Sequence, residues 1–135
     1  MRGRLMSIIK KEPIEIFAEP IYLEEESEPY SEQFVWSYKI TIKNRSERAV
    51  KLRKRHWKIT DSNGLTHEIK GDGVVGMEPV VKPGESFSYT SGAVLSAPSG
   101  IMFGNYEMES LEGESFKVSI PAFSLDSPYE RHQFH

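Results

Sequence analysis

The sequence contains no cysteine, and its 135 residues include no long hydrophobic run. The missing thiols exclude a disulfide framework and zinc sites with thiolate ligands, and they are compatible with a reducing compartment. A short apolar stretch near the N-terminus ends at Lys10 and Lys11, too early for a signal peptide. No segment approaches the roughly 20 apolar residues that a membrane-spanning helix needs. We therefore expect a cytoplasmic protein with no membrane insertion.

Helical periodicity is also scarce, and the strongest pattern has the two-residue period of a β-strand. In Phe34–Asn44, polar side chains alternate with an apolar set on one face, formed by Phe34, Trp36, Tyr38, Ile40 and Ile42. Such a face needs a second apolar layer, and no helix long enough to supply it is visible. The pattern therefore predicts a β-sandwich with this strand at its centre.

The segments on either side of this strand predict two interruptions in the sheet pairing. An opening strand at residues 13–24 contains Pro20, where we expect a bulge or a change of sheet at an edge. Residues 24–32 are polar and predict a solvated loop. A return strand at residues 50–60 changes parity between Leu52 and Trp57, so it requires one extra residue between positions 53 and 56.

Turn signals divide the rest of the chain into further short strands. Asn63-Gly64 predicts a type I′ hairpin turn, and Pro83-Gly84 predicts another tight turn. Pro121 is expected to shift the register of the last strand. Seven or more antiparallel strands at spacings near ten residues are typical of an immunoglobulin-like or fibronectin type III-like β-sandwich. Its length fits one domain, which we place at residues 13–126 between a flexible N-terminus (1–12) and a C-terminal tail (127–135).

Charge is unevenly distributed along the chain, although the net charge is only −3. Residues 12–32 contain eight acids and no lysine or arginine, whereas residues 43–58 contain eight bases and a single acid, Glu47. The basic run can act as an ordinary charged surface that discourages edge-to-edge pairing, or it can dock an acidic partner. We do not expect nucleic-acid binding. Trp57 is predicted to be a core residue and so is not available to stack on a base, and the acidic run would repel a polyanion.

One loop has the spacing G-x-G-x-x-G, and it consists of Gly71, Asp72, Gly73, Val74, Val75 and Gly76. In a dinucleotide-binding fold this motif opens a helix, but Pro79 and Pro83 prevent a helix from starting here. Two interpretations remain. The glycines can let the chain turn sharply while both valines plug the end of the core. Alternatively, the glycine N–H groups can bind an anion beside Arg55, although the negative charge of Asp72 counts against such a site.

The same region carries a family resemblance. The glycine loop (residues 71–76) is followed by Pro83-Gly84-Glu85 and by Phe87, Tyr89-Thr90-Ser91-Gly92. Further matches are Arg55, Trp57 and Ile59 before it and Gly100, Met102, Gly104, Tyr106-Glu107-Met108, Phe116 and Ile120-Pro121 after it. Over residues 14–125 the chain resembles the ApaG family. It departs from the family pattern at His56, where we expect tyrosine in many members.

This resemblance implies a fibronectin-type or immunoglobulin-like sandwich. It also implies a bacterial protein, also called CorD, that is connected with cobalt resistance and magnesium efflux and has no established biochemical activity. Related domains serve as protein-interaction modules in eukaryotic F-box proteins and in a polymerase-interacting protein.

Catalytic and metal-binding chemistry is not marked out by any residue pattern. No serine sits in a nucleophile elbow, no carboxylate pair stands out, and the four histidines lack the spacing of a transition-metal site. We therefore expect a non-enzymatic protein with no cofactor and no metal site, which binds an unidentified protein partner at a sheet edge, at the glycine loop or on the basic run. The alternative hypothesis is a small-ligand protein that binds phosphate or pyrophosphate at the glycine loop and Arg55. The sequence does not define the oligomeric state.

Overall fold

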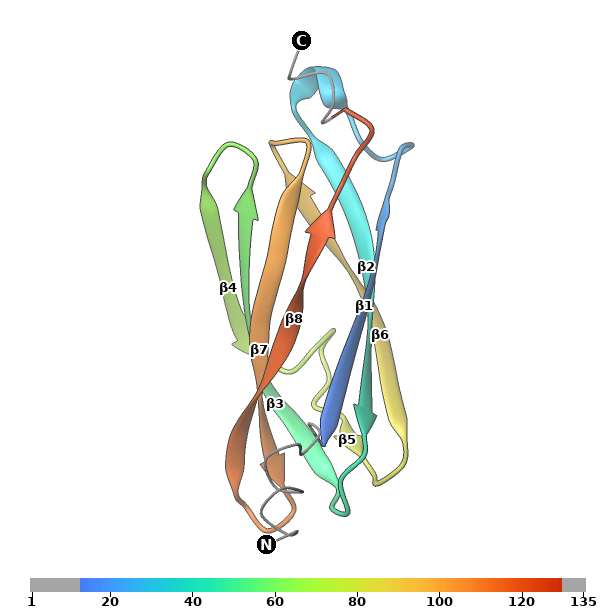
Figure 1. Cartoon of the computed structure of the whole chain (residues 1–135), viewed down its shortest axis with the longest axis vertical. Helices are drawn as coiled ribbons and strands as arrows, with labels where there is room; N and C mark the ends of the chain where they lie inside the picture. The colour runs from blue at the N-terminus through green and yellow to red at the C-terminus, as the bar shows by residue number, and fades with distance from the viewer. Residues whose placement is uncertain (1–12, 130–135) are drawn as a thin grey trace, which may run out of the picture.

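The computed structural model describes residues 13–129, which form two antiparallel sheets packed face to face (Figure 1). The three-stranded sheet has the order β1-β2-β6, with β1 at Ile14–Tyr22, β2 at Phe34–Asn44 and β6 at Ser86–Leu95. The five-stranded sheet has the order β4-β3-β7-β8, formed by Thr66–Asp72, Val50–Asp61, Gly100–Ser110 and Ser115–Leu125 respectively. Its fifth strand, β5 at Val80–Val81, pairs with β3, and a short 3-10 helix occupies Pro29–Ser31. The predicted β-sandwich is confirmed.

Strand β2 lies at the centre of the three-stranded sheet, between β1 and β6, and its apolar face forms much of the core. All five side chains predicted to face inward are buried, and Trp36 is only 1% exposed. Across the core, the Tyr38 ring packs edge-on against Trp57 of β3 at a centroid distance of 5.6 Å. Trp57 in turn packs edge-on against Tyr106 of β7. The central aromatic layer therefore joins both sheets.

Two predicted register shifts are confirmed. On β3, Leu52 pairs with Met108 and Lys54 pairs with Glu107, so Arg53 is the extra residue. The bulge lets residues of even number before it and of odd number after it face the core. On β8, the shift comes between the partners of Met102 and Gly104, at residues 121–122.

The break predicted at Pro20 is wrong. Strand β1 pairs with β2 in one register from Ile14 to Tyr22, with Pro20 opposite Tyr38. Ile21, which the predicted change of register would turn inward, is 61% exposed. The physical reason is that β1 is an edge strand, where a row of N–H groups has no neighbour and a proline need not interrupt the pairing.

The turn type predicted at Asn63-Gly64 is also wrong. A type I′ turn needs positive φ at both central residues, but of these two residues only Gly64 has it, with φ 88°. The Gly64 N–H donates to the Asp61 carbonyl, and the Asp61 carboxylate accepts hydrogen bonds from the N–H groups of Asn63 and Leu65. This side chain stabilises the longer turn.

Beyond β8, the chain continues over one end of the core. The Trp36 indole N–H donates to the Asp126 carbonyl at 2.7 Å. The ring of Tyr129 lies 6.3 Å from that of Tyr22 and 6.0 Å from that of Phe34. Residues 1–12 and 130–135, which hold most of the two predicted tails, lie outside the described part of the chain, and the domain boundaries stay a prediction.

Candidate functional site

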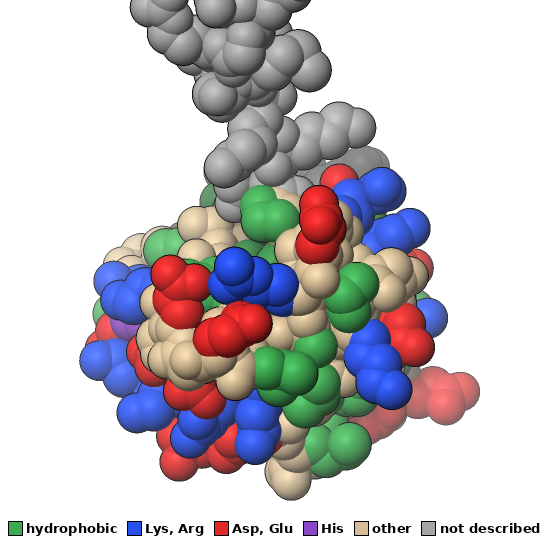
Figure 2. Space-filling model, turned by 90° about the horizontal axis from the view of Figure 1, so that it is seen from below, with side chains coloured by type: hydrophobic (Ala, Val, Ile, Leu, Met, Phe, Trp, Pro, Cys, Tyr) green, Lys and Arg blue, Asp and Glu red, His purple; other side chains and the backbone are tan. Residues whose placement is uncertain are grey.

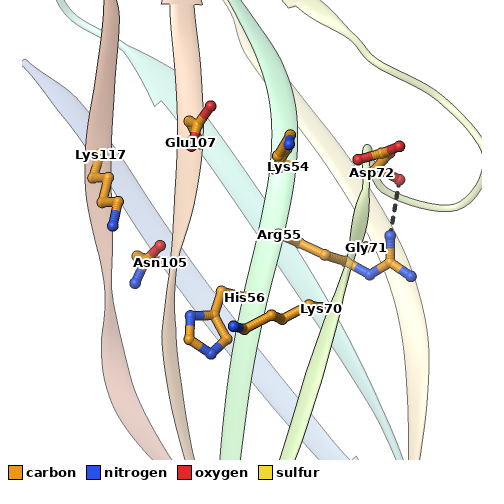
Figure 3. A pocket seen from close by; sticks show the side chains of 9 residues that line it. All are labelled: Lys54, Arg55, His56, Lys70, Gly71, Asp72, Asn105, Glu107 and Lys117. Carbon is orange, nitrogen blue, oxygen red and sulfur yellow. Dashed lines mark hydrogen bonds between the residues drawn. The ribbon is translucent and has the colours of Figure 1, made fainter.

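The outer face of the five-stranded sheet contains a shallow hollow of about 350 Å³, which we call the outer hollow. Strands β3, β4, β7 and β8 of the sheet contribute lining residues (Figure 3). These residues are Lys54, Arg55, His56, Lys70, Gly71, Asp72, Asn105, Glu107 and Lys117. After the Arg53 bulge, even-numbered residues of β3 point away from the core, because Trp57 and Ile59 point into it. The hollow therefore opens to solvent on the side opposite the three-stranded sheet.

Basic side chains in the outer hollow lack close acidic partners. At the β5 end of β3, Arg53 is neutralised by Glu78 and Glu109, each at 2.8 Å. Within residues 13–129, by contrast, Lys54, Lys70 and Lys117 have no carboxylate oxygen within 4 Å. The Arg55 guanidinium lies on the core-facing side of the sheet, so three lysines and the carboxylates of Asp72 and Glu107 remain on the outer face, and the hollow has a small positive excess.

His56 is held in the hollow by a carboxylate on the neighbouring strand. Its Nε2 lies 2.6 Å from the Glu68 Oε2. The hydrogen bond with His56 lowers the pKa of Glu68 despite the opposing effect of burial, and the charges of Lys70 and Lys58 lower it further. Glu68 therefore stays ionised and fixes one ring nitrogen of the histidine.

A different arrangement is found at the lower end of the sandwich. Viewed from that end, lysines and arginines are interspersed with acidic side chains (Figure 2). Arg48 approaches Glu112 at 3.2 Å and Glu114 at 3.9 Å. This end carries both signs in close pairs, unlike the outer hollow.

Arg55 connects the sheet with the glycine loop. It shares the core-facing parity of Trp57, and its Nη1 donates to the carbonyls of Asp72 and Gly73, both at 2.9 Å. A Cβ on Gly71 would lie 2.7 Å from the Arg55 Cζ. A side chain at position 71 would have to displace the guanidinium, so glycine leaves the space that Arg55 occupies.

The other two glycines shape the turn. Gly73 and Gly76 have φ of 62° and 78°, and a Cβ on Gly73 would lie 2.1 Å from the Met77 carbonyl oxygen. The N–H groups of Gly73 and Val74 donate to the carbonyls of Arg53 and Met77, each at 2.8 Å. The Gly73 N–H, one of the glycine N–H groups considered as anion donors, is thus already occupied, and so is that of its neighbour Val74.

The valines of the loop differ from the expectation that both plug the core. Val74 is completely buried, as predicted. Val75 has φ 43° and is 53% exposed, so its predicted burial is wrong. The reason is local, because the tight turn that buries Val74 directs the next side chain to the opposite side.

A second hollow, of about 380 Å³, opens between the two sheets beside the loop, and we call it the inter-sheet pocket. It is lined by Tyr38, Arg55, Trp57, Asp72, Val74, Val75, Gly76, Tyr89 and Ser91. The structure thus brings Arg55 together with four of the six loop residues here. Gly71 meets Arg55 at the outer hollow, while Gly73 lines neither.

The hydroxyl groups of the inter-sheet pocket are not marked in the sequence. Alternation predicts Tyr38 as a core residue and the family match includes Tyr89, but neither pattern indicates where the hydroxyls end. Burial raises the pKa of both phenols, although Ser91 and Arg55 oppose this at Tyr38 and a hydrogen bond to Tyr106 opposes it at Tyr89. Both are therefore protonated at neutral pH.

Comparison with known proteins identifies the family. A family model described as the ApaG domain matches residues 24–110. The chain belongs to the ApaG domain family. Protein ApaG of Parvibaculum lavamentivorans is 58% identical over 122 residues, covering 90% of this chain and 94% of that protein. Protein ApaG of Agrobacterium fabrum is 56% identical over 115 residues, covering 85% and 88%.

Solved structures agree with this assignment of an ApaG fold. A crystal structure of a Bordetella pertussis protein named as ApaA has a TM-score of 0.82 and 38% identity, covering 85% of this chain and 94% of that one. An X-ray structure from the Northeast Structural Genomics Consortium has a TM-score of 0.81 and 46% identity, covering 86% and 88%. The ApaG resemblance drawn from the sequence is confirmed.

Two further features of this ApaG chain bear on its chemistry. Within residues 13–129, no group of three histidine or acidic side chains is arranged to hold a metal ion. The same part of the chain contains no helix of the length and apolarity that a membrane crossing requires.

Proposed function

We propose that this ApaG-family protein is a non-enzymatic, cytoplasmic binding module that holds an acidic protein partner on the outer face of its five-stranded sheet. The observation that carries the proposal is the outer hollow, where Lys54, Lys70 and Lys117 converge from three strands without close acidic partners. The connection with cobalt resistance and magnesium efflux comes from the family resemblance. In this proposal it operates through the bound partner.

Electrostatics supports an acidic occupant. Exposed ion pairs are individually weak, but a group of unpaired charges of one sign raises the association rate of an oppositely charged partner. The carboxylates of Asp72 and Glu107 flank Lys54 on the neighbouring strands. They limit the field, so the partner is expected to engage Lys70 and Lys117 as well as Lys54.

Strand geometry supports a protein rather than a small polyanion as occupant. The lysines project from three different strands around Asn105 and His56, which both offer hydrogen bonds, and His56 is held in place by Glu68. A folded acidic surface can contact all of these groups at once, whereas a shallow hollow surrounds a small ligand poorly.

The sequence-based alternative, phosphate or pyrophosphate bound at the glycine loop and Arg55, has weaker support. Gly73 and Val74 already donate their N–H groups inside the molecule. Asp72 also lines the inter-sheet pocket, and although its side chain flanks Lys54 on the outer face, its negative charge lies near the pocket and opposes a multiply charged anion there.

Charge reversal tests the partner surface. We would capture partners by crosslinking, purify each one, and compare the wild type with the variant Lys54→Glu, Lys70→Glu, Lys117→Glu. An acidic partner should lose at least about ten-fold in affinity to this variant, and wild-type binding should weaken as salt is raised. The control Lys39→Glu, Lys43→Glu, Lys82→Glu changes the net charge equally away from the outer hollow.

Retention of the partner by the first variant would contradict the proposal. An equal loss with the control variant would do so as well, since only net charge would then matter.

A further inference from the structure

A half-buried arginine in the inter-sheet pocket has an open hydrogen-bonding edge. Arg55 has no carboxylate oxygen within 4 Å among residues 13–129. Its Nη1 is held by two backbone carbonyls, which fix the orientation of the guanidinium. Nε and Nη2 make no hydrogen bond within the described chain. In Figure 3 these two nitrogens lie on the side of the guanidinium away from the bond to Asp72.

We infer that the inter-sheet pocket binds a carboxylate group carried on an apolar body, with the Nε and Nη2 groups of Arg55 as its charged donors. A carboxylate matches this edge because its two oxygens can accept two parallel N–H···O bonds. Desolvating an unpaired cation is costly, so an anion that pairs with Arg55 removes a cost already present in the free protein.

Neutral donors surround the guanidinium. The hydroxyls of Tyr38, Tyr89 and Ser91 come from β2 and β6, across the gap between the sheets from Arg55. The Tyr89 hydroxyl also lies 2.5 Å from that of Tyr106. The N–H groups of Val75 and Gly76 make no hydrogen bond within residues 13–129. The pocket therefore offers several donors but a single cation.

This balance of charges favours a monoanion over phosphate or pyrophosphate. Asp72 lines the same pocket, so each extra negative charge on a ligand is repelled. Trp57 and Val74 are almost completely buried at the back of the pocket, so the exposed Val75 side chain is the apolar surface that an apolar or aromatic body next to the carboxylate would contact. Such a group can belong to a free organic acid or to the C-terminus of a peptide that ends in an apolar residue.

The inference is tested with benzoate and its neutral isostere benzamide, added to the full-length protein labelled with ¹⁵N. The reporters are the amides of Val75 and Gly76 and the Nε–H of Arg55, with Gly113 in the distant β7–β8 hairpin as internal control. Benzoate should shift the reporters in a saturable way, with benzamide, phosphate and pyrophosphate each at least about ten-fold weaker.

Two peptide ligands distinguish the source of the carboxylate. Acetyl-Gly-Gly-Phe with a free C-terminus is compared with its C-terminal amide. Tighter binding of the free peptide than of benzoate assigns the pocket to a protein or peptide C-terminus. Tighter binding of benzoate assigns it to a free organic acid.

The variant Arg55→Lys keeps the charge but removes the paired Nε and Nη2 donors, so benzoate affinity should fall about ten-fold or more. Arg48→Lys, at an exposed turn, is the matched control and should bind as the wild type does. Three results would overturn the inference: no shift up to about 50 mM benzoate, equal binding of benzoate and benzamide, or stronger binding of pyrophosphate. The ligand comparison needs no variant, so it decides the matter even if Arg55→Lys fails to fold. It uses neither the outer lysines nor a protein partner, so its result is independent of the proposed function.

Discussion

Each glycine of the loop at residues 71–76 meets a different steric constraint. Gly71 leaves room for a guanidinium, Gly73 combines positive φ with a close backbone contact, and Gly76 has positive φ in open space. The regular G-x-G-x-x-G spacing therefore combines three glycines that are needed for three different physical reasons. None of them involves a bound phosphate.

Alanine at two of these positions separates backbone conformation from steric contact. Gly76→Ala should cost about 1–2 kcal/mol in the free energy of unfolding, the usual penalty for a side chain in the left-handed region. Gly73→Ala has the same penalty, and its Cβ must also displace the Met77 carbonyl, which would lie only 2.1 Å away. We expect its cost to be at least twice as large, measured by urea unfolding. Equal costs would show that the Met77 contact does not constrain the loop.

At the scale of the element, the β3–β4 hairpin depends on one buried carboxylate. The Asp61 side chain is completely buried and accepts hydrogen bonds from two backbone N–H groups and from His67. Burial raises the pKa of Asp61, but the hydrogen bonds from His67, Leu65 and Asn63 outweigh it and hold the pKa below its usual value. The ionised form is thus stabilised by folding.

This pKa shift gives the stability of the hairpin a definite pH dependence. Because the folded pKa is lowered, the stabilisation is complete above the unfolded value near 4 and is lost as pH falls through the folded value. Asp61→Ala should lower the free energy of unfolding by about 1–3 kcal/mol at pH 7, since it leaves partly buried N–H groups without an acceptor. The difference from wild type should shrink in urea titrations below about pH 4.

Glu47→Ala, at an exposed turn position, is the matched control and should change stability little at either pH. A loss for Asp61→Ala that stays constant down to the most acidic conditions would show that packing, not ionisation, makes the residue important.

Elements with strong alternation could be predicted from the sequence, and those set by their neighbours could not. The bounds of β2, the extra residue on β3 and the shift near Pro121 all follow from parity, because a buried face imposes it. The edge position expected at Pro20 is correct, but the parity change after it does not mark a break, because β1 keeps one register with β2 and simply exposes Ile21. Strand β5 has two residues, too few to show any period.

The candidate site was predictable to a similar extent. Arg55 and the glycine loop could be selected together, because a basic residue and a glycine cluster suggest an anion site. The hydroxyls of Tyr38 and Tyr89 could not, since they line the same pocket as Arg55 only after two sheets have packed. The outer hollow likewise depends on strands β4 and β8 lying on opposite sides of β3 and β7.

On the scale of the whole molecule, the two sheets are unequal, and this leaves parts of the larger one uncovered. Strand β4 is exposed along its length apart from Gly71, which is half-buried beneath Arg55. Both hollows adjoin this strand, on its two sides. The inter-sheet pocket thus arises where the three-stranded sheet no longer covers its partner, whereas the outer hollow lies on the opposite, solvent-facing side of the larger sheet.

The end of the sandwich beyond β8 is closed by chain that follows the last strand. Tyr129 packs its ring against Tyr22 and Phe34 and donates its hydroxyl to Glu24 at 2.9 Å. Tyr129→Ala should therefore lower the free energy of unfolding by about 1–2 kcal/mol, less than a core aromatic, because the ring is only partly buried. Tyr30→Ala is the matched control, since Tyr30 is fully exposed, and its urea midpoint should equal that of wild type. If both variants unfold like the wild type, the Tyr129 ring does not stabilise the core, and the contribution of the chain after β8 is limited to the Asp126 carbonyl that accepts from Trp36.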